Sequence, residues 1–434
     1  MWHPAEGDSP RALHIGRAGG TLSGMRIALV IEHLDRRRGG AEVYVHDFAA
    51  WLLRAGHEVA IVTEDAHDPP AGAEVHTAAA SGCPLCGCVG DFAEASREAL
   101  ARLGPDVSLA TGKALGMSVY QPHGGTVRGS QRQNAALVRS ANLRALKLAW
   151  NRVSPKHWAA RSLEARQFAN PRTHFVAVSQ MVRRDMRTFY GLPEERITVI
   201  YNGVDLERFH PERVRARREE TRRRFGVGEG MALFLFVAHN FRLKGLGELI
   251  RALGVLRGAA AGGSRAAPTV RECGAWSPAN GRGMTMPPAF HLLVAGRGRA
   301  GPYRRLARRC GVADRVTFAG ATAEVEALYG AADALAHPTW YDPCSLVALE
   351  ALACGLPVLT TRFNGASELM AGRECGVVLD GPRSVSRLGE GIGQLLDAGS
   401  RARMSVAARR VAEEHPQERN FREMLGVLER AART

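Results

Sequence analysis

Short apolar runs alternate with longer amphipathic stretches along most of the chain. Two of these runs, Met25–Ile31 and Val59–Val62, enclose a glycine-rich turn and a helical stretch that ends near Leu53. Short apolar runs are typical of strands that a parallel sheet buries on both faces. A strand, a glycine loop, a helix and a second strand, in this order, predict a parallel α/β sheet.

The same alternation continues as far as residue 200. Further strands of the first sheet are expected at Val107–Ala110, Ser118–Tyr120, Phe175–Val178 and Ile197–Ile200. Regular structure then breaks at Asn202-Gly203, a dipeptide that favours turns. A very basic segment with helical character follows over Arg213–Arg224.

A second α/β pattern begins at residue 233. Its helices are expected at Gly245–Leu256, Tyr303–Cys310 and Glu324–Ala331, and its strands at Leu233–Val237, His291–Val294, Val316–Phe318, Ala334–Ala336 and Val358–Thr361. Two consecutive patterns of this kind predict an α/β protein with two Rossmann-like, doubly wound domains that face a cleft. Ligands of such sheets bind at the carboxyl ends of the strands.

The length of 434 residues also exceeds one ordinary hydrophobic core. We expect a disordered N-terminal extension over residues 1–24, with Met25 as an alternative start. A first domain over 25–205 and a second over 206–418 follow, and residues 419–434 form a helix that packs back on the first domain. Residues 258–288 are rich in Gly, Ala, Ser, Pro and Arg without periodicity, which predicts a disordered insertion.

Composition and charge narrow the class of protein. The chain is 45% hydrophobic and 23% charged, as in ordinary soluble proteins. No apolar run approaches the ~20 residues needed to cross a bilayer, and no apolar stretch near the N-terminus indicates a secretory signal. The 8 cysteines, scattered among predicted core segments, fit a reducing cytoplasm. A net charge of +15 favours an anionic partner, although an Arg-rich genome composition would also produce it.

The most informative segment runs from Tyr341 to Thr361. Asp342 and Glu350 lie eight positions apart, and Ser345 between them is a candidate helix N-cap. A helix that starts there would point free amides toward the space beside Asp342, and such helix ends bind phosphate. The arrangement suits a sugar nucleotide, with phosphates at the helix end and hydroxyl groups at the carboxylates. The alternative is a capped amphipathic helix with an incidental surface glutamate.

Three glycine or basic loops follow predicted strands. Gly39-Gly40 after the first strand would let backbone amides approach a phosphate or a sugar, although a plain tight turn needs the same residues. Arg242 and Lys244 follow the first strand of the second domain and could neutralise a leaving diphosphate; a solvated basic helix start is the alternative.

The third loop, Gly296-x-Gly298-x-x-Gly301, matches a dinucleotide fingerprint. It follows the second strand of its domain rather than the first, and no acid ends the following strand, so we favour a glycine loop that lines a nucleotide cleft.

Two weaker signals lie in the first domain. His123 ends a predicted strand and could orient an acceptor or the moving sugar, or could be a simple turn histidine. Cys83, Cys86 and Cys88 have a spacing typical of metal sites. A closed zinc site needs four ligands, His76 would have to be the fourth, and we favour incidental loop cysteines and no metal.

Residues 128–172 form a basic segment with interleaved apolar side chains. It holds ten Lys and Arg residues against one acid, Glu164, with Trp150 and Trp158 among several leucines. Tryptophan together with Lys and Arg at helical spacing indicates a segment that docks on an anionic membrane surface. A basic solvated helix over the acceptor cleft is the alternative.

The Asp342-x7-Glu350 pair, with its Gly355–Thr361 continuation, resembles the E-x7-E motif of family 4 glycosyltransferases. These are retaining enzymes of the GT-B fold, and the first acid of the motif is Asp in this chain. The resemblance extends from Met25 onward apart from the insertion, and it is strongest over residues 233–368. Within the family the chain is most similar to enzymes of the lipopolysaccharide core glucosyltransferase I type.

The resemblance implies transfer of a hexose from a nucleotide sugar, which we expect to be UDP-linked, with retention at the anomeric carbon. It implies roles in donor binding and catalysis for a set of residues. Glu350 would hold the ribose, the helix capped by Ser345 would meet the phosphates through amides of Leu346 and Val347, Asp342 would bind the hexose, and Lys244 with Arg242 would stabilise the departing diphosphate.

The resemblance also implies where the remaining candidates lie. Gly39 and Gly40 would lie over the donor phosphates and the acceptor, and His123 on the acceptor side. The glycine loop at Gly296 and Gly298 and the turn at Ala319-Gly320 would flank the base. Such enzymes need neither metal nor cofactor, because cations and a helix dipole serve the diphosphate.

The expected partners are a nucleotide sugar, a glycan or glycolipid acceptor of the cell envelope, and an anionic membrane surface, without nucleic acid. The expected location is cytoplasmic, on the inner face of the cytoplasmic membrane. Two alternatives stay open: a non-catalytic membrane or polyanion binder of the same fold, and an NAD-dependent oxidoreductase built on Gly296–Gly301. The acceptor, the hexose, the nucleotide and the oligomeric state stay undetermined.

Overall fold

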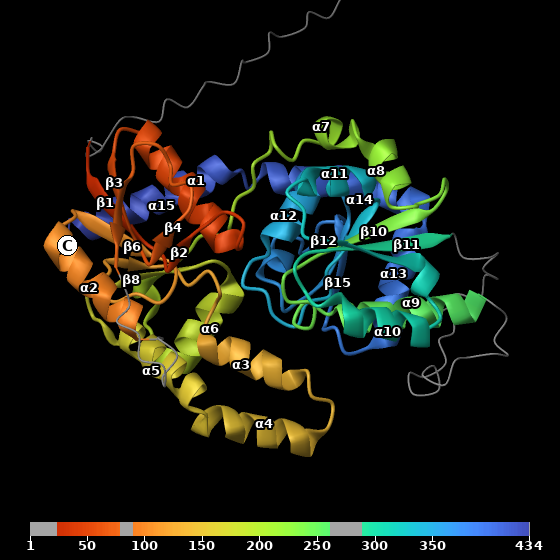
Figure 1. The fold of residues 1–434 in the computed structure, drawn as a ribbon, viewed down its shortest axis with the longest axis horizontal. Coiled ribbons are helices and arrows are strands. Elements are labelled where there is room, and N and C mark those ends of the chain that lie inside the picture. The colour runs from red at the N-terminus through yellow and green to blue at the C-terminus, as the bar shows by residue number, and fades with distance from the viewer. Residues whose placement is uncertain (1–23, 79–89, 261–288, 434) are drawn as a thin grey trace, which may run out of the picture.

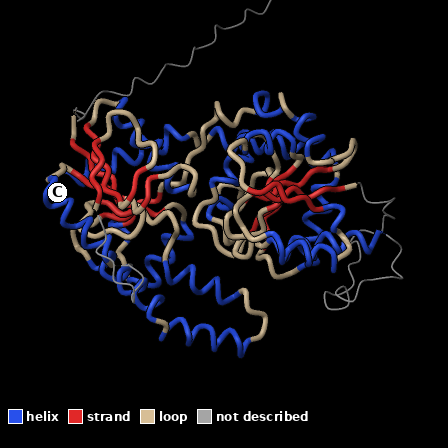
Figure 2. Tube along the Cα trace, in the orientation of Figure 1, coloured by secondary structure: helices blue, strands red, loops and turns tan. Residues whose placement is uncertain are grey.

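The computed structural model describes residues 24–78, 90–260 and 289–433. In these ranges the chain forms two lobes, and each has a sheet between layers of helices (Figures 1 and 2). The expected N-terminal extension up to residue 23, most of the expected insertion, and the three cysteines at 83, 86 and 88 lie outside the described residues. Residues 258–260 were expected in the insertion, but they form the end of helix α9 (Leu246–Ala260).

The N-terminal lobe contains a 7-stranded sheet whose pairs are all parallel, in the order β5-β3-β1-β6-β7-β8-β9. Its strands are β1 (Arg26–Val30), β3 (Glu58–Thr63), β5 (Glu74–Thr77), β6 (Val107–Ala110), β7 (Val119–Tyr120), β8 (His174–Ala177) and β9 (Ile197–Val199). A separate short pair joins β2 (His33–Leu34) to β4 (Asp65–Ala66). The helices of this lobe are α1 (Gly40–Arg54), α2 (Asp91–Leu103), α3 (Val127–Ala136), α4 (Ala141–Val153), α5 (Pro155–Ala169) and α6 (Gln180–Tyr190).

The C-terminal lobe contains a 6-stranded parallel sheet in the order β12-β11-β10-β13-β14-β15. Its strands are β10 (Ala232–Val237), β11 (Phe290–Ala295), β12 (Val316–Gly320), β13 (Ala334–Ala336), β14 (Val358–Thr361) and β15 (Gly376–Leu379). Its helices are α7 (Pro211–Arg215), α8 (Arg218–Arg224), α9, α10 (Ala300–Arg309), α11 (Val325–Ala331), α12 (Leu346–Ala353), α13 (Val385–Leu396) and α14 (Ala398–Glu413).

Each sheet reverses its strand order beside its first strand, which is the doubly wound arrangement predicted from the sequence. The prediction of two Rossmann-like domains is therefore confirmed. Strands β6, β13 and β14 begin and end at the predicted residues. Their residues are buried throughout, because helices cover both faces of a parallel sheet.

The basic segment Arg213–Arg224 was predicted as one helix and is two. Arg217 leaves helical geometry (φ −106°, ψ 18°) between α7 and α8. The break turns two arginines of α8 toward the end of the sheet, where Asp333 accepts from Arg218 at 2.5 Å and from Arg222 at 3.2 Å. Long-range ion pairing thus overrides the local helical preference of this segment.

The last helix, α15 (Gln417–Ala432), leaves the C-terminal lobe and lies on the N-terminal one (Figure 1). Its Phe421 ring lies 5.2 Å from the Phe48 ring of α1 and belongs to the same buried cluster as β1. The crossing runs beside the linker between the lobes, because the Val204 amide donates to the His415 carbonyl and the Gln417 amide donates to the Val204 carbonyl. The chain therefore passes between the lobes twice, at the linker and before α15, and the two passages lie side by side.

Helices α3, α4 and α5 form an extension that projects from the N-terminal lobe (Figure 1). Their ends agree with local capping signals: Thr126 and Ser140 cap α3 and α4 through their hydroxyl groups, and Pro155 opens α5. No helix in the described ranges combines the length and the hydropathy that crossing a bilayer would require.

Candidate functional site

The start of helix α12 presents unpaired amides to the space between the lobes. The Ser345 hydroxyl accepts a hydrogen bond from the Ala348 amide at 3.3 Å, as an N-cap does. Within the described residues, the amides of Leu346 and Val347 have no hydrogen-bonding partner. These amides and the helix dipole favour an anion at this end of the helix.

Asn364 fixes the cap and the loop before it. Its side-chain oxygen accepts from the Ser345 amide at 3.2 Å and from the Ala366 amide at 3.1 Å, and its amide group donates to Thr360 at 3.0 Å. The loop also exchanges backbone hydrogen bonds with Asp342 on each side of Asn364. Sequence reasoning missed Asn364, although the Asn-Gly pair after β14 is a turn signal that could have indicated it.

Lys244 and Asp342 form an ion pair beside this helix end. Lys244 Nζ lies 2.6 Å from Asp342 Oδ2 and donates to the Tyr341 carbonyl at 3.1 Å. The two side chains are only 19% and 13% exposed. The residues predicted to serve the diphosphate and the hexose are therefore in direct contact with each other.

His337 lies buried close to this pair. Burial lowers the pKa of His337 to about 4, and the Lys244 charge adds to that effect while Asp342 opposes it. Its Nδ1 has no hydrogen-bonding partner in the described part of the chain. A neutral imidazole with a free nitrogen thus lies near the Lys244–Asp342 pair, and sequence reasoning did not identify it.

Glu350 lies on the same helix and faces a pocket between the lobes. Its Oε2 accepts a hydrogen bond from the Tyr329 hydroxyl at 2.6 Å. Burial raises the pKa of Glu350, while the Tyr329 hydrogen bond and the Arg208 charge act against that rise. The contact with Tyr329 joins α12 to α11, whose buried residues share one cluster, and spacing along the sequence does not reveal this pairing.

The pocket that Glu350 faces has a volume of about 330 Å³. Its walls come from both lobes: Tyr44 and Asp47 on α1, Arg208 on the linker, and Phe421 on α15. Arg36 closes one side and pairs with Asp47 at 3.1 Å. A polar ligand that enters here would therefore contact both lobes at once.

Gly39 and Gly40 begin α1 directly opposite the α12 helix end. A Cβ atom on Gly40 would lie 2.8 Å from Leu346 Cδ1, so the absence of a side chain permits this close approach. Two residues before Gly39, the Arg37 carbonyl accepts a hydrogen bond from the Arg297 guanidinium at 2.5 Å. The structure thus brings the first glycine loop, the helix end and the Gly296 loop together.

The Gly296 loop lies at the carboxyl ends of three strands. The Gly296 amide donates to the Gly320 carbonyl at 2.8 Å, which joins this loop to the turn at Ala319-Gly320. Gly296 has φ +126°, and a Cβ there would lie 1.8 Å from the Ala238 carbonyl oxygen. Gly298 packs against the Phe241 ring in the same way. These glycines serve close packing of three strand ends at the cleft.

Arg242 is not brought to the Lys244–Asp342 pair. It is exposed, and no contact with Asp342 is observed among the described residues. Its charge acts instead on Lys147 of α4, where burial and Arg242 together lower the lysine pKa. Both residues lie in the turn that precedes α9, where Lys244 is mostly buried and Arg242 is exposed.

His123 lies on the wall of the N-terminal lobe. Its Nε2 lies 2.8 Å from the Gln121 side-chain oxygen, and its ring lies 4.4 Å from the Tyr44 ring, which lines the pocket. Burial lowers the pKa of His123 to about 4, so the imidazole is neutral near pH 7. Two residues on, Gly125 packs against the Tyr341 hydroxyl, next to Asp342.

A second set of contacts holds the lobes against each other. The Glu368 carboxylate accepts from the amides of Gln180 and Met181 at the start of α6, at 2.8 Å each, and from the Tyr201 hydroxyl at 2.8 Å. The Asn202 side chain donates to the Cys344 carbonyl at 2.8 Å. Position along the chain gave no sign of these contacts, because their partners lie more than a hundred residues apart.

The assembled groups can bind an anion and a polyol together. The Lys244–Asp342 pair lies next to the capped start of α12, Gly40 approaches Leu346 there, and Glu350 follows on the same helix beside the pocket. No group of three or more potential metal-ligating side chains occurs in the described ranges. The three cysteines with metal-like spacing lie outside those ranges, and His76 pairs with Glu74.

Two family models match the chain. The model described as Glycosyltransferase Family 4 matches residues 38–208, and that described as Glycosyl transferases group 1 matches residues 217–411. The first match covers Gly39, Gly40 and His123. The second covers Lys244, Asp342 and Glu350, together with the Gly296 loop, so the fingerprint there lies within a glycosyltransferase domain.

Relatives with assigned names are also similar to parts of the chain. A D-inositol 3-phosphate glycosyltransferase of Salinispora tropica is 32% identical over 304 residues, which are 67% of this chain and 56% of the relative. The lipopolysaccharide glucosyltransferase WaaG of Escherichia coli K12 is 30% identical over 206 residues, 48% of each chain. The chain thus spans about half the length of the curated relatives that it matches.

The fold is shared more widely than the sequence. The crystal structure of WaaG, a glycosyltransferase involved in lipopolysaccharide biosynthesis, superposes with a TM-score of 0.74 at 22% sequence identity. The superposition covers 93% of this chain and 99% of that chain. The arrangement of the two lobes is therefore that of a known two-domain fold.

Proposed function

The chain belongs to the family 4 glycosyltransferases of GT-B fold, and we propose that it transfers a hexose from a nucleotide sugar, UDP-linked, to a cell-envelope glycan or glycolipid. The observation that carries the proposal is the Lys244–Asp342 pair beside the capped end of α12, with Glu350 facing the pocket between the lobes. Side chains and amides of the kinds that would bind a diphosphate and sugar hydroxyls thus lie on and beside α12. The family relation supports retention at the anomeric carbon.

In this proposal the donor diphosphate binds at the start of α12. The amides of Leu346 and Val347 would donate to phosphate oxygens, and Lys244 would supply the opposing charge. Lys244 would then share its charge between Asp342 and the phosphates, and Asp342 would accept hydroxyl groups of the hexose. The base would lie beside Ala319 and Gly320, where backbone groups are available.

Bond breaking between the anomeric carbon and the phosphate oxygen releases a diphosphate anion. Lys244, which is mostly buried, and the α12 amides would stabilise that growing charge, and such donors act most strongly in a partly dry cleft. His123 on the opposite wall, neutral near pH 7, would face the acceptor. We expect transfer without a metal ion, so activity should survive EDTA.

Glu350 would hold the ribose. Tyr329 occupies its Oε2 atom, which fixes the carboxyl group and leaves Oε1 for hydroxyl groups of a ligand in the pocket. A carboxylate held in this way loses little side-chain entropy when it binds a ribose. The proposal therefore gives Tyr329 a positioning role.

We also propose that the extension docks on an anionic membrane surface at the inner face of the cytoplasmic membrane. The α4 and α5 helices expose large apolar side chains, with Leu146 66%, Trp150 64% and Trp158 63% exposed. Basic residues surround them, as in interfacial helices. Stronger binding to anionic than to neutral vesicles at low salt would support docking, and equal binding would refute it.

The test of the proposed function is a thermal-shift screen of nucleotide sugars with the purified chain, followed by mass analysis of products formed with cell-envelope lipid extracts. A UDP-hexose should raise the melting temperature and appear as one added hexose on a lipid. Stabilisation by NADH and by no nucleotide sugar would contradict the proposal. Vesicle binding without donor hydrolysis would instead favour the non-catalytic alternative.

A further inference from the structure

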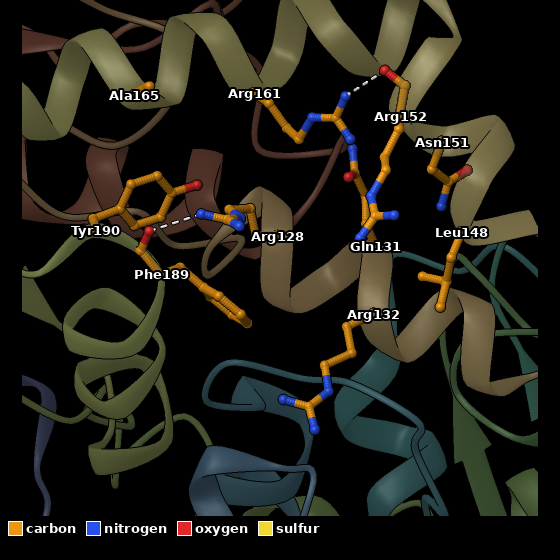
Figure 3. Close-up of a pocket in the computed structure, with 10 residues that line it drawn as sticks. All are labelled: Arg128, Gln131, Arg132, Leu148, Asn151, Arg152, Arg161, Ala165, Phe189 and Tyr190. Carbon is orange, nitrogen blue, oxygen red and sulfur yellow. Dashed lines mark hydrogen bonds between the residues drawn. The ribbon is translucent and has the colours of Figure 1, made fainter. Parts of the chain in front are cut away.

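A basic pocket lies within the helical extension, apart from the Glu350 pocket. Helices α3, α4 and α5 and the end of α6 line it, and its volume is about 590 Å³ (Figure 3). Its lining includes four arginines, Arg128, Arg132, Arg152 and Arg161, and no carboxylate. A cavity of this size accommodates a sugar-sized ligand.

The positive charge of the pocket is not neutralised by ion pairs. Within the described residues, none of the four arginines is paired with a carboxylate, whereas Arg166, also on α5, pairs with Glu94 at 2.5 Å. The nearby buried acid, Glu164, accepts hydrogen bonds from Tyr190 and from the Val127 amide. Burial raises the pKa of Glu164 to about 7, so this carboxyl offsets only part of the charge.

Two of the guanidinium groups are held in place by contacts that leave donors free. Arg128 donates to the Phe189 carbonyl at 2.8 Å and lies 5.2 Å from the Phe189 ring centre. Arg161 donates to the Arg152 carbonyl at 2.9 Å (dashed lines in Figure 3). Each guanidinium carries five N–H groups, so most of them stay available. Their planar, forked arrangement matches two oxygens of a phosphate or carboxylate group.

A buried amide group also lines the pocket. Asn151 is 5% exposed and lines the wall, and no hydrogen bond of its side chain is observed among the described residues. The Asn151 amide can therefore bond to a ligand in the pocket without giving up a contact within the protein. Gln131, whose Nε2 lies 3.3 Å from His157 Nδ1, adds a second amide. Amide and guanidinium donors together suit an anion with several oxygens.

The pocket lies on the side of the extension that approaches the reaction cleft. Arg132 acts on the carboxyl group of Asp185, and Asp185 Oδ2 lies 3.4 Å from the Tyr341 hydroxyl. Tyr341 precedes Asp342 in the chain. Lys147 of α4 likewise lies near Arg242 of the other lobe. A molecule in the pocket could therefore extend toward the place where the hexose would be transferred.

We propose that this arginine pocket binds a phosphate monoester carried by the acceptor. The part of the inference that names the acceptor rests on the proposed function, while anion binding by the pocket does not. Forked pairs between guanidinium groups and phosphate oxygens supply the affinity, and the amides of Asn151 and Gln131 take further oxygens. The adjacent apolar face of α4 would lie beside the rest of the acceptor.

The test is calorimetric titration of the full chain with glucose 6-phosphate and with glucose, in the presence of UDP to occupy the donor site. A second arm measures binding to vesicles that contain phosphatidate, which carries the same group on a lipid, against phosphatidylcholine. The variant is Arg132→Gln/Arg152→Gln, and Arg166→Gln is the matched control on α5. Arg132→Lys/Arg152→Lys keeps the charge and removes the fork, and stands in if the Gln variant does not fold.

In the first arm the protein should bind glucose 6-phosphate and not glucose; in the second it should bind phosphatidate in preference to phosphatidylcholine. The arm that responds tells whether the phosphate is carried on a sugar or on a lipid part of the acceptor. Losing two charge-assisted contacts should weaken that binding by about tenfold or more, with the Arg166 variant unchanged. Equal binding by the wild type and the double variant, or no preference for phosphate in either arm, overturns the proposal. UDP affinity, titrated separately, should be the same in all variants. A chain that does not bind UDP would contradict the proposed donor site without affecting the test of the arginine pocket.

Discussion

The Lys244–Asp342 pair should be energetically coupled, and its coupling can be measured with the variants Lys244→Met, Asp342→Asn and both together. Lys244 Nζ lies 2.6 Å from Asp342 Oδ2, with side chains 19% and 13% exposed. Coulomb's law with an effective dielectric constant of about 20 gives about 6 kcal/mol of attraction at this distance. Desolvation of two ions removes several kcal/mol of that. We therefore expect a coupling free energy of about 2 kcal/mol.

The two single variants should differ in a defined order. Lys244→Met leaves a mostly buried carboxylate without its cation and should cost about 3 kcal/mol. Asp342→Asn should cost less, about 1–2 kcal/mol, because Lys244 keeps the Tyr341 carbonyl at 3.1 Å. Adding both costs would overstate the loss in the double variant.

The assay is urea unfolding followed by tryptophan fluorescence, because Trp340 is buried close to the pair. The exposed pair Arg387–Glu390, at 3.2 Å with side chains 74% and 39% exposed, provides a matched cycle on the same lobe. Exposed pairs of this kind couple by at most about 0.5 kcal/mol. If the costs of Lys244→Met and Asp342→Asn simply add, so that their coupling free energy is no larger than that of the exposed pair, the reasoning is refuted.

Three further predictions concern single residues. Gly296→Ala should destabilise the protein by about 3 kcal/mol in thermal unfolding, since Gly296 has φ +126° and a Cβ would overlap a backbone oxygen, whereas Gly393→Ala in α13, with open space around it, should be neutral or stabilising. Tyr329→Phe removes the 2.6 Å hydrogen bond to Glu350, so it should raise the donor KM about fivefold and also lower the melting temperature; an unchanged KM would remove the positioning role. Because burial lowers the pKa of His123 from 6.5 to about 4, the unfolded chain binds more protons between those values, so stability should fall as pH falls through this window and should fall less in His123→Gln; identical urea midpoints against pH would contradict this.

Local signals in the sequence were enough to predict most of the strands. The apolar runs at Val107–Ala110 and Val358–Thr361 became β6 and β14, because burial on both faces selects continuous apolar residues. The Ser345 cap followed from a rule about side chains and the next three amides. Apolar strands and helix caps depend on residues that are close together in the sequence, so they can be predicted from it directly.

The contacts that complete the site depend on chain segments far apart. Tyr329 meets Glu350, and Asn364 meets Ser345, only because the sheet order brings α11, α12 and the loop after β14 together. Lys244 reaches Asp342 while Arg242 is exposed, a difference within one turn that spacing along the sequence did not resolve.

His337 also could not be identified from the sequence, because its burial depends on packing between distant segments. A histidine within an apolar stretch can be a core residue or part of a site, and its sequence context does not separate the two. Only the packing around it, which lowers its pKa to about 4 and leaves Nδ1 without a partner in the described residues, draws attention to it.

The central claim is that a nucleotide sugar binds where α12 meets the cleft, with Glu350 on its ribose. The most direct measurement is UDP-hexose hydrolysis and transfer by Glu350→Ala beside Glu390→Ala, a matched change at a surface glutamate of α13 that pairs only with Arg387 in the described residues. The account predicts near-complete loss of both activities in Glu350→Ala and normal rates in Glu390→Ala. Near-normal rates in Glu350→Ala would contradict it.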